Sequence, residues 1–133
     1  MMDRKLMQAA MEARKNAVAP FSDFKVGAAL LAKNGKIYRG CNMENSAFSP
    51  TLCAERAAFA AAIADGIRDF EAIAVVGDGT DYCYPCGVCR QVMAEFCDDD
   101  FKIIVMKDDK DCVICTLGEL LPHAFRLKKP NEK

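Results

Sequence analysis

Three cysteines and one glutamate offer the clearest chemistry in this sequence. Cys53 and Glu55 belong to the run Cys-Ala-Glu, and Cys86 and Cys89 frame the run Cys-Gly-Val-Cys. Thiolates are good zinc ligands; a structural zinc site is closed by four protein ligands, whereas a catalytic site keeps one position open for water. Three thiols with a carboxylate close by therefore predict a hydrolytic zinc site, in which Cys53, Cys86 and Cys89 hold the ion.

Glu55 is the candidate proton shuttle of this site. Zinc lowers the pKa of bound water, and a carboxylate in a dry pocket can take the proton and return it. Glu55 lies only two residues after Cys53, so inside a helix the two side chains would point to opposite sides. The assignment therefore requires Cys53 at the mouth of the helix. The alternative is an ordinary acidic residue in a first turn, where the helix dipole favours it.

Arg56 is a candidate for tuning the metal from outside the ligand set. Zn²⁺ with three thiolates is a net anion, and such a centre acidifies water poorly unless something positive offsets it. Two helix N-termini contribute about +1 together. Arg56, three residues after Cys53, shares its helical face and can donate to its sulfur. The alternative is a solvated surface arginine.

Two helices must position these side chains. The segment from Cys53 to Asp65 is rich in alanine and is followed by Gly66, a residue that commonly ends helices. A second helix is expected from Cys86 to Phe96. A helix N-terminus lowers the pKa of a cysteine, so both helix starts favour thiolates. Gly87, between two of the cysteines, should leave the backbone free to bend.

The remaining elements complete an α/β pattern. An N-terminal amphipathic helix closed by Pro20 is expected to bury one face, formed by Leu6, Ala10, Ala13 and Ala17. Strands are expected at residues 25–32, 36–42, 71–77, 102–107 and 112–116, with a hairpin turn at Asn34-Gly35 and a short helical turn at 118–121. Because the last two strands are joined by only residues 108–111, they should pair antiparallel. The order predicts a five-stranded mixed sheet flanked by helices.

Length, charge and cysteine content narrow the class of protein. With 133 residues, the chain should form a single domain over 1–133. A net charge of −1 counts against nucleic-acid binding, which favours basic surfaces. No apolar run reaches membrane-spanning length, and the N-terminus does not have a signal-peptide pattern. Eight cysteines without a signal peptide favour free or metal-bound thiols in the cytoplasm.

The later pair Cys112 and Cys115 leaves a second arrangement open. With the Cys-Gly-Val-Cys run it could close a four-thiol zinc ribbon, and the chain would then be a non-catalytic, zinc-stabilised binding module. Against this, the residues between Cys112 and Cys115 are β-branched, and a ribbon would leave Cys53 unexplained. His123, the sole histidine, is expected at the surface.

Taken together, these motifs resemble the small, zinc-dependent, homotetrameric cytidine deaminases, from about Phe21 to Phe125. The resemblance rests on five blocks in order: residues 24–30, 40–45, 53–56, 85–91 and 120–125. It implies a cytidine deaminase-like three-layer fold, one zinc per subunit, and active sites shared between subunits. It also implies zinc binding by the three cysteines singled out above.

Further roles follow from the resemblance alone. It implies that Asn42 and Glu44 bind the ribose hydroxyls and that Phe24 packs against the pyrimidine face. Ala54 is a further implied substrate contact, and Phe125 is implied to reach into the site of a neighbouring subunit. The implied reaction is hydrolysis of the C4 amino group of cytidine or deoxycytidine in pyrimidine salvage, with Glu55 moving the protons. Phe48 stands where many members carry tyrosine, so a modified nucleoside such as blasticidin S is an alternative substrate.

Overall fold

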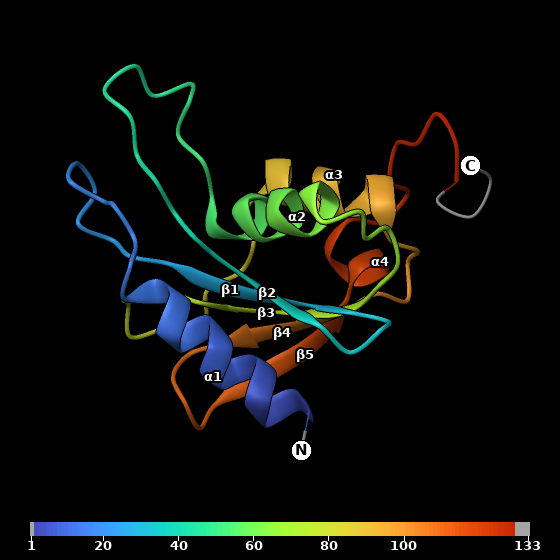
Figure 1. Cartoon of the computed structure of the whole chain (residues 1–133), viewed down its shortest axis with the longest axis horizontal. Coiled ribbons are helices and arrows are strands. Elements are labelled where there is room, and N and C mark those ends of the chain that lie inside the picture. The colour runs from blue at the N-terminus through green and yellow to red at the C-terminus, as the bar shows by residue number, and fades with distance from the viewer. Residues whose placement is uncertain (1, 130–133) are drawn as a thin grey trace.

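One five-stranded sheet organises the chain (Figure 1). In the computed structural model, which describes residues 2–129, the strand order is β2-β1-β3-β4-β5. The strands are β1 (Gly27–Ala32), β2 (Ile37–Cys41), β3 (Phe70–Val76), β4 (Lys102–Met106) and β5 (Cys112–Thr116). Strands β3 and β4 pair in parallel and the other neighbours pair antiparallel, including β4 and β5. The predicted mixed sheet and its antiparallel last pair are confirmed.

Helices cover both faces of this sheet. Helices α2 (Ala54–Ala64) and α3 (Gly87–Phe96) lie together on one face, and α1 (Met2–Arg14) lies on the other (Figure 1). Alternate residues of the central strands belong to two hydrophobic cores, one on each face of the sheet. Leu30 and Ile73 belong to the core that includes residues of α2 and α3, and Leu31 and Ala74 belong to the core that includes residues of α1. The three-layer expectation is therefore confirmed. Helix α4 (Leu117–Leu120) is a single turn after β5.

The first helix is shorter than the sequence predicts. It ends at Arg14 rather than at Pro20, and Ala17 lies beyond it. The backbone N–H of Val18 donates to the carbonyl of Asn42 at 2.9 Å, and Val18 forms a bridge with Met43. This pairing with the segment after β2 takes the backbone groups that a longer helix would use. Among the described residues, no helix is long and apolar enough to cross a membrane.

Close contact between α2 and β2 seats the first turn of α2. A Cβ atom added at Gly40 would lie 2.3 Å from the Ala54 carbonyl oxygen and 2.5 Å from the Ala58 nitrogen. Only glycine permits this approach, because both neighbours are backbone atoms that cannot rotate away. The position of the α2 N-terminus therefore depends on Gly40.

We expect Gly40→Ala to destabilise the fold by about 1–3 kcal/mol, the usual cost of overpacking. The measurement is thermal unfolding at equal zinc occupancy. Gly87→Ala is the matched control, because a Cβ atom there would meet nothing within 4 Å. Equal unfolding midpoints for the two variants would contradict the claim that Gly40 positions the N-terminus of α2.

Candidate active site

Three thiols converge where α2 and α3 begin. Cys53 is the N-cap residue of α2, Cys86 is the N-cap residue of α3, and Cys89 lies in the first turn of α3. Their Sγ atoms all lie within 4.8 Å of one another; the Cys53–Cys86 distance is 3.8 Å and the Cys86–Cys89 distance is 3.5 Å. Two sulfurs bound at ~2.3 Å to one tetrahedral ion would be ~3.8 Å apart. The three thiols therefore fit a zinc ion.

The placement at helix N-termini explains how residues far apart in sequence can share an ion. Cys53 lies at the mouth of α2, as the assignment of Glu55 required. Gly87 differs from expectation, because its φ lies outside the left-handed region and its Cα faces open space. The turn between Cys86 and Cys89 is thus ordinary helical backbone rather than a glycine-dependent bend.

The alternative four-thiol ribbon is wrong. Cys112 and Cys115 lie on β5, where they pair in register with Met106 and Ile103 of β4. Over residues 2–129, the group of side chains that could hold a metal consists of Cys53, Cys86 and Cys89. His123 is exposed after α4, as the sequence predicted, and lies outside that group.

Glu55 is buried beside the thiols. Its side chain is only 4% exposed and lies in the first turn of α2. Burial disfavours the charged carboxylate and raises the pKa of Glu55 to about 7; a hydrogen bond from its own backbone N–H opposes the rise, proximity to Cys53 adds to it, and a weaker contribution from a hydrogen bond with Cys89 opposes it. A carboxyl group with such a pKa can both hold and release a proton near neutral pH.

Arg56 contacts the same thiol cluster through Cys53. Its Nη2 atom donates to Cys53 Sγ at 3.2 Å. The hydrogen bond between Cys53 and Cys89, with the help of Arg56, lowers the pKa of the Cys53 thiol to about 5. The guanidinium is therefore in contact with the sulfur, where the sequence predicted it, rather than free in solvent.

Phe24 and Asn42 meet at the edge of the sheet. The Asn42 side chain accepts from the Val26 N–H at 2.8 Å and donates to the Phe24 carbonyl at 2.9 Å. A Cβ atom at Gly77 would lie 2.5 Å from the Phe24 ring, so the ring lies directly over the end of β3. Phe24 as a whole remains 39% exposed, so the residue is accessible to a ligand.

Glu44 lies next to this pair. Its carboxylate accepts the backbone N–H groups of Phe21 at 2.9 Å and Ser22 at 3.1 Å, and the Ser22 hydroxyl. These hydrogen bonds, that of the hydroxyl first, lower the pKa of Glu44 and keep it ionised. The sequence analysis missed Ser22; the available signal was a hydroxyl two residues before Phe24.

Ala54 and Phe125 occupy very different surroundings. Ala54, between Cys53 and Glu55 in the sequence, is fully buried. Phe125 is 69% exposed, and Gln91 of α3 donates to its carbonyl at 2.8 Å. The chain thus fixes the backbone of Phe125 while its ring stays exposed.

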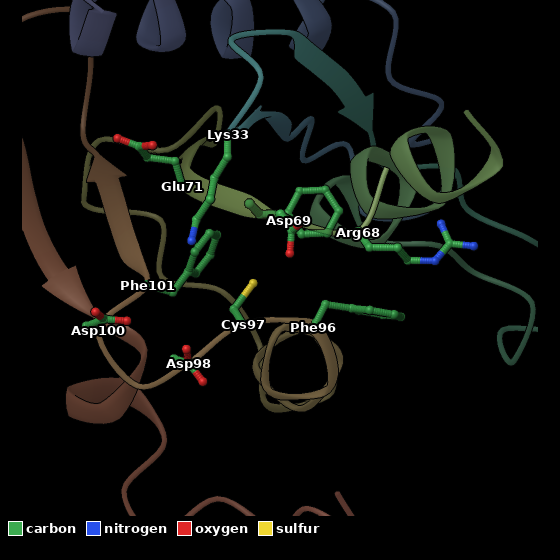
Figure 2. A pocket seen from close by; sticks show the side chains of 10 residues that line it. Lys33, Arg68, Asp69, Glu71, Phe96, Cys97, Asp98, Asp100 and Phe101 are labelled. Atoms are coloured by element: carbon green, nitrogen blue, oxygen red, sulfur yellow. The ribbon is translucent and has the colours of Figure 1, made fainter. Parts of the chain in front are cut away.

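A cavity of about 510 Å³ lies at the opposite end of the sheet (Figure 2). It is lined by residues at the end of α3 and the start of β3 and β4, among them Lys33, Cys97 and Phe101. Figure 2 shows Lys33 reaching toward the Phe101 ring. Since the thiols lie at the N-terminal ends of α2 and α3, this cavity is separate from them, and the sequence-predicted site residues do not line it.

Comparison with known proteins points to a single family. Residues 1–106 match the family described as the cytidine and deoxycytidylate deaminase zinc-binding region. A cytidine deaminase of Sporosarcina psychrophila is 50% identical over 91% of this chain and 89% of its own. One from Halalkalibacterium halodurans is 47% identical over 98% of this chain and 100% of its own.

Solved structures agree with these sequence relatives. The crystal structure of cytidine deaminase from Burkholderia pseudomallei superposes with a TM-score of 0.90, at 44% identity, covering 94% of this chain and all of that one. A blasticidin-S deaminase of Bacillus cereus is more distant, at 33% identity over 75% of this chain and 76% of its own.

We expect Cys53→Ala to lose most of the bound zinc, because two thiols and water hold the ion less well than three thiols. Metal analysis of the purified protein measures this loss. Cys112→Ala is the matched control, since Cys112 lies on β5 away from the cluster, and it should keep its zinc. Full zinc content in the Cys53 variant would refute the three-thiol site.

Proposed function

Because the chain belongs to the zinc-binding cytidine deaminase family, we propose that it hydrolyses the C4 amino group of cytidine and deoxycytidine. The products are uridine or deoxyuridine and ammonia. The observation that carries this proposal is a buried carboxyl, Glu55, beside three converging thiols. A purely structural metal site has no use for such a group, so a non-catalytic binding module leaves Glu55 unexplained.

Proton transfer is the task of Glu55. Zinc held by Cys53, Cys86 and Cys89 would make a bound water acidic enough to serve as the nucleophile. Glu55 takes the proton of the attacking water and delivers it to N3 of the cytosine ring. It then takes the second proton from the hydroxyl newly bonded to C4 and carries it to the amino group; the C4–N bond breaks, ammonia leaves, and the C4 carbonyl forms. Burial of Glu55 keeps bulk water from intercepting these protons.

The residues around Phe24 would hold the nucleoside. The Phe24 ring offers an aromatic face to the pyrimidine, and Glu44 accepts hydrogen bonds from the sugar hydroxyls. Asn42 uses one of its two N–H donors on Phe24, which leaves the other for the sugar. Ala54 is the remaining proposed contact. A net charge of −1 favours a nucleoside over a nucleic acid.

We also propose a homotetramer with shared active sites, in which the exposed Phe125 ring enters the site of a neighbouring subunit. We place this activity in pyrimidine salvage in the cytoplasm. The eight free cysteines of the structure fit a reducing compartment of that kind. Cytidine is preferred over blasticidin S as substrate, because the blasticidin-S deaminase is the more distant relative.

Glu55→Gln should keep zinc but slow turnover by about 10²–10⁴-fold, the usual contribution of a general acid–base group. Absorbance assays with cytidine, deoxycytidine and blasticidin S, paired with metal analysis, measure both effects. Glu71→Gln, an exposed glutamate on β3, is the matched control and should retain activity. A near-normal rate in the Glu55 variant would exclude Glu55 as the shuttle.

Phe125→Ala should raise KM for cytidine several-fold, because a desolvated aromatic contact is worth about 1 kcal/mol or more. Steady-state kinetics measure the change, and size-exclusion chromatography reports whether the assembly persists. Leu127→Ala removes a side chain that is 88% exposed and should leave KM unchanged. Unaltered kinetics for the Phe125 variant would count against shared sites.

A further inference from the structure

Ser22 joins two parts of the proposed substrate site. Its hydroxyl donates to Glu44 Oε2 and accepts the backbone N–H of Phe24 at 3.0 Å. Its own backbone N–H donates to Glu44 Oε1 at 3.1 Å, beside that of Phe21 at 2.9 Å. One small side chain therefore touches both the carboxylate assigned to the sugar and the backbone of the residue assigned to the base.

We propose that Ser22 is a positioning residue, which fixes the Glu44 carboxylate relative to Phe24. Glu44 can then bind the sugar of the nucleoside while Phe24 contacts its base. This inference rests on the proposed function, because it takes Glu44 as the acceptor of the sugar hydroxyls. Ser22 acts through Glu44 and Phe24 and has no step in the proton transfer.

The hydrogen bonds at Glu44 determine which oxygen faces the ligand. A carboxylate oxygen has about two acceptor sites. The Phe21 and Ser22 backbone N–H groups take both sites of Oε1. The Ser22 hydroxyl takes one site of Oε2, so the free acceptor is on Oε2. A sugar hydroxyl must therefore bind the oxygen that Ser22 orients.

The backbone of Phe24 is held from both sides. Its N–H donates to Ser22 Oγ at 3.0 Å, and its carbonyl accepts from Asn42 at 2.9 Å. Ser22 is thus the link between Glu44 and a segment that Asn42 and Gly77 already fix. Without the Ser22 hydroxyl, Glu44 keeps only the Oε1 bonds and its free oxygen can turn. Ordering it again on binding costs conformational entropy, which pre-organisation avoids.

Steady-state kinetics with two substrates test this role. Ser22→Ala should lower kcat/KM for cytidine about tenfold, mainly through KM, since a hydrogen bond to a charged group is lost. For 2′,3′-dideoxycytidine, which lacks the 2′- and 3′-hydroxyls of the sugar, the loss should be several-fold smaller. Ser22→Thr, which keeps a hydroxyl, should restore most of the affinity. Ser46→Ala, an exposed serine in the loop after β2, is the matched control.

A double-variant cycle separates positioning from general damage. In a Glu44→Ala background, Ser22→Ala should cost little more, because its partner is already gone. Thermal unfolding of each variant is measured alongside, and the Ser22→Thr comparison serves if the alanine variant unfolds.

Equal losses on both substrates, or fully additive losses in the double variant, would overturn the role of Ser22. An unaltered KM for cytidine in an active Ser22→Ala enzyme would overturn it as well, and would leave the proposed function intact. A parent enzyme that does not deaminate cytidine would instead refute the proposed function, and this inference with it.

Discussion

The structure depends on the requirement that two helix N-termini meet within reach of one ion. Helix α2 precedes β3 and helix α3 follows it, and both lie on the same face of the sheet (Figure 1). Because Gly40 lets α2 settle directly against β2, Cys53 comes within 3.8 Å of Cys86. The sheet and its close helix contact are therefore conditions for the metal site.

Charge balance at that point accounts for the neighbouring residues. Three thiolates are costly to gather in one place unless positive groups face them. The helix dipoles of α2 and α3 and the Arg56 guanidinium supply that positive charge, and zinc would supply the rest. The same buried environment raises the pKa of Glu55, which turns an ordinary acid into a group that can exchange protons at neutral pH.

Much of this arrangement could be predicted from residue types and spacing, because zinc ligands are few in kind and helices and strands have distinct periods. Residue types and spacing predicted the thiol cluster, the position of Cys53 at the start of a helix, and the antiparallel pairing of the last two strands. The early end of α1 could not be predicted, since it depends on Val18 pairing with the segment after β2. Nor could the link through Ser22, because its partner Glu44 is 22 residues away and only the fold brings them together.

The central claim is that the polypeptide supplies three sulfur ligands and leaves the fourth position of the ion to water or substrate. X-ray absorption at the zinc edge of the purified, zinc-loaded protein tests this claim most directly. The account predicts a first shell of about three sulfurs at ~2.3 Å and one lighter atom at ~2.0 Å. A shell of four sulfurs would contradict it.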